Sequence, residues 1–141
     1  MSTVKTIQVD IVSAEKALFS GRAESLVATA IYGEVGILPN HAPLLAELKP
    51  GEVRVKINEN TTEIFYISGG MLEVQPDSVT VLADTAERAK DLDEAQALKA
   101  KQRAEQILHE KHTDFDYAKA RAEIAMAAAQ LRAIQKLRDK H

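Results

Sequence analysis

The sequence predicts an α+β fold in which an antiparallel β-sandwich is followed by an antiparallel α-helical hairpin. All six glycines and all four prolines of this 141-residue chain occur at or before Pro76, and an alanine-rich stretch without either residue follows. Glycine and proline mark the turns between short strands, whereas a long stretch without them permits uninterrupted helices. We therefore expect a β-sandwich domain over residues 1–86 and a helical hairpin over residues 87–141.

Apolar and polar residues alternate in the first part with the period of half-buried strands. The pattern is clearest at residues 7–11 and 53–57. Several short strands at close spacing are typical of a β-sandwich or a flattened barrel. Further strand-like runs occupy residues 18–19, 26–29, 64–67, 71–74 and 79–82.

The second part carries helical signals from Glu87 onward. Asp91 and Glu94 have the spacing of a capping box, with Asp in place of the usual Ser or Thr, and predict the start of the first helix. A polar break at residues 109–113 precedes a second helix that begins at Asp114 or Asp116. One apolar stripe then follows helical spacing through Tyr117, Ala120, Ile124, Ala127, Leu131 and Ile134.

Alanine dominates the faces by which the two helices would pack, for example at Ala97, Ala100 and Ala104. Such a seam buries little apolar area, since a buried methylene contributes only about 0.8 kcal/mol. Alanine also has high helix propensity, so each helix would persist after separation from its partner. The hairpin is therefore either a detachable element with two packings close in energy or a permanently docked one.

The stretch from Gly33 to Leu45 contains two glycines and two prolines and predicts a shaped surface corner that presents Glu34 and His41. No local pattern supplies a nucleophile or a paired acid for His41, so a contact role is favoured over catalysis. His109 and His112 offer only two local ligands on an exposed link, which predicts a solvated turn and no metal site.

Composition narrows the function classes further. A net charge of −3 gives no electrostatic case for binding nucleic acid or a bulk membrane surface. The chain has no cysteine, and it contains neither the apolar core of a signal peptide nor an apolar run of roughly 20 residues that could span a bilayer. We expect a soluble protein whose membrane association goes through partners.

Four short motifs together carry a resemblance to a known family. They occur in the order Gly33-Glu34-x-Gly36-Ile37-x-Pro39, His41-Ala42-Pro43-Leu44-Leu45, Ser68-Gly69-Gly70 and Thr80-Val81-Leu82-Ala83-Asp84. In this order and spacing they resemble the epsilon subunit of the bacterial F-type ATP synthase, and the similarity extends over essentially the whole chain.

The resemblance implies a non-catalytic rotor subunit of a proton-translocating enzyme, peripheral on the cytoplasmic face of the bacterial plasma membrane. Its implied partners are the gamma subunit, the membrane rotor ring and, through the tail, the alpha and beta subunits. The residues implied on the ring side are Glu34, Gly36, His41, Ala42 and Pro43. Those implied to meet the catalytic head, where they would restrain ATP hydrolysis, are Arg132, Lys136 and Arg138.

Some members of that family bind regulatory ATP through a motif that opens the first helix, here Leu92-Asp93-Glu94-Ala95-Gln96-Ala97. Gln96 stands where the motif has arginine, which removes a fixed charge suited to phosphate. Asp93 and Arg121 remain as matching positions, so no cofactor is expected beyond weak regulatory ATP. Two other classes stay open: a free-standing adaptor, and a small β-barrel enzyme using His41 and Glu34.

Overall fold

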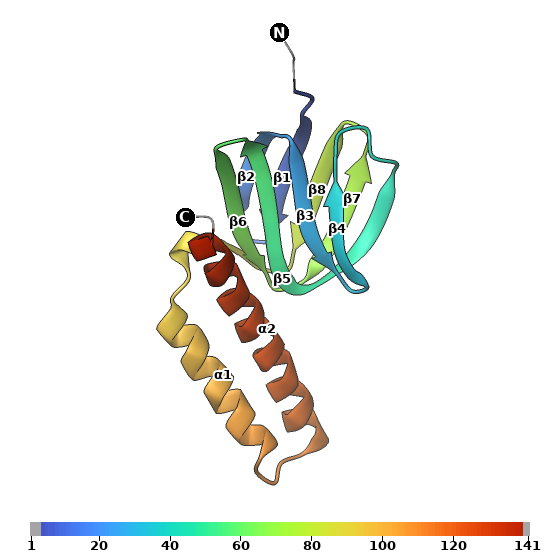
Figure 1. The fold of residues 1–141 in the computed structure, drawn as a ribbon. Helices are drawn as coiled ribbons and strands as arrows, with labels where there is room; N and C mark the ends of the chain where they lie inside the picture. The colour runs from blue at the N-terminus through green and yellow to red at the C-terminus, as the bar shows by residue number, and fades with distance from the viewer. Residues whose placement is uncertain (1–3, 140–141) are drawn as a thin grey trace.

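The computed structural model describes residues 4–139 and consists of a β-sandwich from one end of which a helical hairpin projects (Figure 1). This architecture confirms the fold predicted from the sequence. The described strands are β1 (Ile7–Ser13), β2 (Ala17–Ala23), β3 (Ser25–Ala30), β4 (Gly33–Ile37), β5 (Leu44–Asn58), β6 (Thr61–Ile67), β7 (Gly70–Gln75), β8 (Ser78–Ala83) and β9 (Ala86–Arg88). The helical elements are a 3₁₀ turn η1 (Ala89–Asp91), α1 (Glu94–Leu108) and α2 (Asp114–Asp139).

The long strand β5 joins the two layers of the sandwich. Its first part, Leu44–Leu48, pairs with β7, and its second part, from Gly51 onward, pairs with β6. The change of partner falls at Pro50, which has no N–H to donate and is therefore suited to a break in the ladder. The next position requires glycine, because a Cβ atom at Gly51 would lie 2.7 Å from Cβ of Thr29.

One layer has the order β2-β1-β8-β7 and continues into β5, and the other comprises β4, β3, the rest of β5, β6 and β9. Neighbouring strands are antiparallel except β1 and β8, which pair in parallel from Gln8 opposite Ser78 to Ser13 opposite Ala83. This pair departs from the fully antiparallel sandwich that we expected. Parallel pairing requires a long connection, and the whole β2–β7 segment supplies it.

The sandwich core is aliphatic, as the low aromatic content predicts. Its largest fully buried side chains include Phe65, Ile7, Ile11, Leu26 and Leu72. Burial alternates along β1, β3 and β7 with the period-two pattern of the sequence, whereas Ile64–Ile67 of β6 are all buried.

The segment after Thr85 is not yet helical, and this corrects the expectation of helix from Glu87. Residues 86–88 form β9, which pairs with β6 and places Ala86 in the sandwich core. Arg88 lies over the Phe65 ring at 5.2 Å and donates to Glu63 at 2.5 Å. The sheet therefore extends two residues beyond the expected boundary at residue 86.

The first helix is capped two residues later than predicted. Asp93, not Asp91, is the N-cap, and its side chain accepts a hydrogen bond from the Gln96 amide at 3.1 Å. Asp91 instead ends the preceding 3₁₀ turn, because Leu92 after it is extended and donates its amide to Ala89. The sequence contains three acidic residues within four positions, and only the backbone path selects among them.

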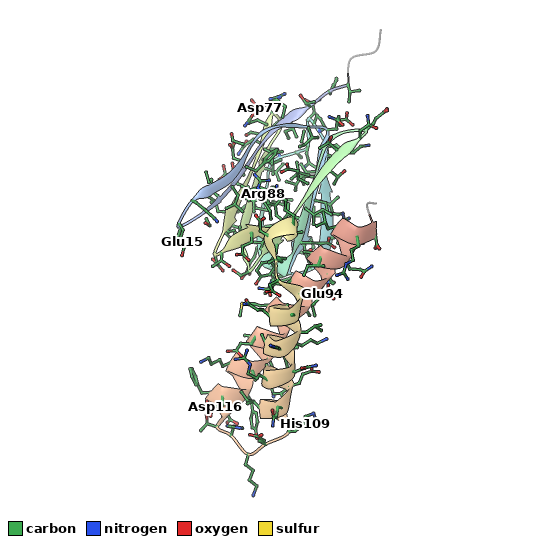
Figure 2. The ribbon with its side chains drawn as sticks, turned by 90° about the vertical axis from the view of Figure 1, so that its left-hand side faces the viewer. Glu15, Asp77, Arg88, Glu94, His109 and Asp116 are labelled. Atoms are coloured by element: carbon green, nitrogen blue, oxygen red, sulfur yellow. The ribbon has the colours of Figure 1, made fainter. Side chains whose placement is uncertain are left out.

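The two helices pack as predicted through alanine. Ala97 and Ala104 of α1 and Ala120 and Ala127 of α2 are buried. The hairpin turn around His109 lies farthest from the sandwich in both views (Figures 1 and 2). Within residues 4–139 no cluster of His, Cys, Asp or Glu could hold a metal ion, and no helix is long and apolar enough to cross a membrane.

Candidate functional site

Glu34 lies on β4 beside the β3–β4 turn, opposite Thr29 in the sheet. Its Oε2 atom accepts a hydrogen bond from Arg54 of β5 at 3.1 Å, and its side chain remains 57% exposed. The arginine fixes the carboxylate without burying it. Glu34 is therefore available to a partner in a defined orientation.

His41 belongs to the loop at the other end of β4. The loop is held by the Asn40 amide, which donates to the Pro76 carbonyl at 2.8 Å, and by the left-handed backbone of Asn40 at φ 68°. The His41 ring approaches the Ala42 carbonyl through Nδ1 at 2.7 Å. Ala42 and Pro43 are exposed beside it, as is Gly36 on β4.

Glu34 and His41 therefore do not share one corner, contrary to the single shaped corner that we expected. Residues 33–37 form a strand, and at about 3.3 Å per residue the loop begins roughly 10 Å beyond Glu34. Glu34 and His41 therefore lie at opposite ends of β4. The sequence did not show this, because a five-residue stretch with two glycines is equally compatible with a loop.

The basic residues at the end of α2 face different surroundings in the folded hairpin. Arg138 pairs with Glu94 at the start of α1, and Figure 2 shows Glu94 at the end of the hairpin that adjoins the sandwich. Lys136 is exposed but close enough to Glu52 of β5 to act on its ionisation. Arg132 is exposed on the same last turns.

The C-terminal half of α2 also docks on the sandwich, a contact that the sequence analysis missed. Ala129 and Ala133 are fully buried against Ile64 and Tyr66 of β6. Leu92, Met126 and Leu137 pack around this cluster. The available signal was the spacing of Ala129 and Ala133, four positions apart on a second face of α2.

A buried carboxylate lies on this same face. Glu52 of β5 is only 5% exposed and is paired across the strands with Tyr66. Its Oε1 atom lies 3.2 Å from Arg54, while Oε2 has no hydrogen-bond partner among the described residues. Burial raises the pKa of the Glu52 carboxyl, against the opposing charges of Arg54 and Lys136.

A cavity of about 440 Å³ opens between the sandwich and the hairpin. Its ionisable lining is mostly acidic, with Glu15, Glu87 and Glu123 against Lys16, and it includes Tyr66. Burial raises the pKa of Tyr66, and the side chain of Gln130 on α2 hydrogen bonds to it. Neither Asp93 nor Arg121 lines this cavity.

The two positions expected to serve regulatory ATP lie far apart. Asp93 adjoins Glu94, which pairs with Arg138, and Arg121 lies 17 positions before Arg138 on α2, so about 25 Å separates the two along the helix. The Asp93 carboxylate also caps α1. The folded hairpin therefore does not bring these two residues into one site.

Family models match both parts of this architecture. The beta-sandwich domain of the ATP synthase delta/epsilon chain matches residues 6–89, and the long alpha-helix domain of the same chain matches residues 85–135. The chain belongs to the ATP synthase delta/epsilon family. The two matches meet at β9 and η1, where the structure also changes from sheet to helix.

Relatives within this family are similar over nearly their whole length. The ATP synthase epsilon chain of Nitrosococcus oceani is 59% identical over 135 residues, covering 96% of each chain. That of Thioalkalivibrio sulfidiphilus is 61% identical over 134 residues, covering 94% of this chain and 95% of the relative. The similarity therefore includes both the sandwich and the hairpin.

Solved structures show the same fold at low sequence identity. A chain of the Euglena gracilis mitochondrial ATP synthase, solved as an OSCP/F1/c-ring assembly, matches with a TM-score of 0.83 at 17% identity, covering 94% of this chain and 84% of that one. A chain from the central stalk and c-ring of the Tetrahymena thermophila mitochondrial enzyme matches with a TM-score of 0.65 at 14% identity, covering 94% and 99%.

Proposed function

We propose that this epsilon-type chain is a non-catalytic rotor subunit that links gamma to the membrane ring through its sandwich and restrains ATP hydrolysis through its tail. The observation that carries the proposal is the division of the molecule. A rigid sandwich exposes Glu34 and most of the His41 loop, and a helical hairpin docks on it through Ala129, Ala133, Met126 and Leu137 of α2.

The sandwich suits the transmission of torque, since its two layers share β5 and one aliphatic core. Glu34 would contact a polar partner surface at one end of β4, and His41, Ala42 and Pro43 would do so at the other. The family resemblance supports a ring-facing role for these residues and for Gly36 between them, and all of them except the half-buried His41 are exposed.

The hairpin suits a regulatory element because two of the four α2 residues in the docking cluster are alanines and the other two, Met126 and Leu137, are only partly buried. Ala129 and Ala133 contribute single methyl groups, each worth about 0.8 kcal/mol when buried. Arg138 and Lys136 would meet acidic surfaces of the alpha and beta subunits when the tail extends, and Arg132 lies beside them. In the folded hairpin Arg138 is instead occupied by Glu94.

Purification of the complex that contains this chain tests the proposal. The chain is given an affinity tag and expressed in a bacterium together with the other ATP synthase subunits encoded by that bacterium. It should co-purify from detergent-solubilised membranes with gamma and the ring subunits. Before solubilisation it should sediment with the membrane fraction. Within the membrane it should be accessible from the side that bears the catalytic head. Recovery of the chain alone from the cytosol would instead favour a free-standing adaptor.

An enzymatic role is tested separately. The His41 ring contacts only its own loop among the interactions described for it, and Glu34 lies at the other end of β4. The purified chain should therefore show no hydrolase or isomerase activity that His41→Ala abolishes. A His41-dependent activity of the isolated chain would favour the small β-barrel enzyme.

A further inference from the structure

We propose that Glu52 couples docking of α2 on the sandwich to proton uptake, so that the tail is held more tightly as the pH falls. Docking is a property of this chain alone. It is measured without other subunits, and its outcome is independent of whether the tail restrains ATP hydrolysis.

The geometry places Glu52 beneath the tail. Glu52 and Tyr66 are direct cross-strand partners on the outer face of the β5–β6 pair. Tyr66 belongs to the cluster that Ala129 and Ala133 of α2 cover. Figure 1 shows the last turns of α2 running beside this layer, and α2 packs against both β5 and β6. Glu52 therefore lies buried on the face of the sandwich that α2 covers.

The carboxylate is incompletely compensated in this position. Arg54 contacts Oε1 of Glu52 at 3.2 Å but also bonds to Oε2 of Glu34 at 3.1 Å, so one guanidinium nitrogen serves two carboxylates. Oε2 of Glu52 is buried with no hydrogen-bond partner among the described residues. A buried anionic oxygen without a donor is costly, and protonation lowers that cost because it removes the charge.

The charged and titratable groups that act on Glu52 come from three strands and α2. Arg54 on β5 and Lys136 on α2 favour the anion, and Glu34 on β4 opposes it. Tyr66 on β6 is the cross-strand neighbour. Burial outweighs the two cations, so the pKa of Glu52 is raised above its ordinary value of 4.5 in the docked state.

The raised pKa of Glu52 determines how docking of α2 depends on pH. Departure of α2 exposes the face and returns the carboxyl toward its ordinary pKa, so the docked state binds the proton more tightly. Docking is then favoured most at pH values below 4.5 and weakens as the pH rises through the raised pKa. One linked proton changes the docking equilibrium by at most about tenfold per pH unit.

Hydrogen exchange of the full chain tests the proposal. The opening constant of α2 amides at residues 126–137 is compared between wild type and Glu52→Gln at each pH from 5 to 8, so that the intrinsic pH dependence of exchange cancels. Glu73→Gln is the matched control, because Glu73 is an exposed carboxylate on β7 in the other layer.

We expect the ratio of wild-type to Glu52→Gln opening to rise several-fold between pH 5 and pH 8, while Glu73→Gln follows wild type. The ratio for β1 and β8 amides should stay constant. A flat ratio for α2 would overturn the proposal. An equal rise in β1 and β8 would overturn it too, because Glu52 would then act on the whole fold.

Carbon-13 NMR of the wild-type chain provides a second measurement that needs no Glu52 variant. The Glu52 carboxyl should titrate above the ordinary glutamate value of 4.5. Shortening α2 by a stop codon at Arg132, which removes Ala133 of the docking cluster and the Lys136 charge, should move the Glu52 midpoint toward 4.5. A wild-type Glu52 midpoint at or below 4.5 would overturn the proposal.

Discussion

Arg138, in the last turn of α2, donates to the carboxylate of Glu94 in the first turn of α1, 44 positions earlier in the sequence. The contact ties together the two ends of the hairpin beside the sandwich. It also occupies one of the basic residues proposed to meet the catalytic head. An acidic partner of Arg138 would therefore compete with Glu94 for its guanidinium group.

Glu94→Gln should loosen the folded hairpin slightly and release Arg138. Both side chains are substantially exposed, at 59% for Arg138 and 38% for Glu94, so the pair is worth about 0.2–1 kcal/mol. Hydrogen exchange of the last turns of α2 should accelerate by less than about fivefold. Glu105→Gln, an exposed and unrelated acid on α1, should leave exchange unchanged. Equal exchange in both variants would mean that the pair does not restrain the tail.

A disulfide across the alanine seam should lock the hairpin. Ala104 of α1 and Ala127 of α2 are both buried, and a disulfide between cysteines at these positions would report that their Cα atoms approach within about 7 Å. The double variant Ala104→Cys/Ala127→Cys has no competing thiol in this chain. In the assembled enzyme, oxidation should raise ATP hydrolysis and reduction should reverse it, whereas Ala104→Cys alone should respond to neither.

Removal of the chain from Arg132 onward should raise hydrolysis in the same way. Because both changes disable the same element, their effects should not add. A complete cross-link on a gel with unchanged hydrolysis would instead indicate that the hairpin is a static support for the sandwich.

The residues at the two ends of β4 should contribute to the coupling of proton flow to ATP synthesis without contributing to folding. Glu34→Ala removes an exposed ion pair and His41→Ala removes a loop contact, so each should change the free energy of unfolding by under about 0.5 kcal/mol. Each should reduce ATP synthesis driven by a proton gradient in membrane vesicles. Glu59→Ala, at an exposed hairpin turn, serves as the control. Lost stability with intact coupling would assign these residues to the fold.

The sandwich should fold without the tail, provided that β9 is retained. A fragment ending at Asp91 keeps β9 and Arg88, whereas a fragment ending at Thr85 loses both. Arg88 donates to Glu63 and to the Leu18 carbonyl, and hydrogen bonds to charged groups contribute about 1.5–3 kcal/mol each. Chemical denaturation should show cooperative unfolding for the longer fragment and a lower midpoint, or none, for the shorter. Equal midpoints would exclude β9 from the folding unit.

The start of α2 should fray in acid. The Thr113 side chain and amide both hydrogen bond with Asp116, which holds the pKa of the Asp116 carboxyl below its ordinary 3.8. A lowered pKa contributes stability that is present above 3.8 and lost as the pH falls through the lowered value. NMR of the Tyr117 amide should report this loss, and Asp116→Asn should abolish its dependence on pH. Asp114→Asn should retain it.

The local pattern of the sequence determined much of the fold. Alternation at residues 7–11 and 53–57 specified strands because one face of each lies on the aliphatic core. The absence of glycine and proline after Pro76 allowed two uninterrupted α-helices, and the alanines between them predicted the seam at Ala104 and Ala127. These features depend on neighbours within a few positions, so the sequence alone carries them.

Contacts between distant segments were decided only by the tertiary structure. Residues 86–88 became a strand because the edge of β6 offered backbone partners, and no local pattern encodes that edge. Arg88 meets Leu18 across 70 positions. The sequence likewise led us to predict that Glu34 and His41 lie on one corner, although the length of β4 separates them. Glu52 occupies an outward position in its strand beside Tyr66, on the face that α2 covers, and is nevertheless buried. Burial by a remote element has no signature in the local sequence, because it arises from packing between surfaces that the chain brings together only after folding.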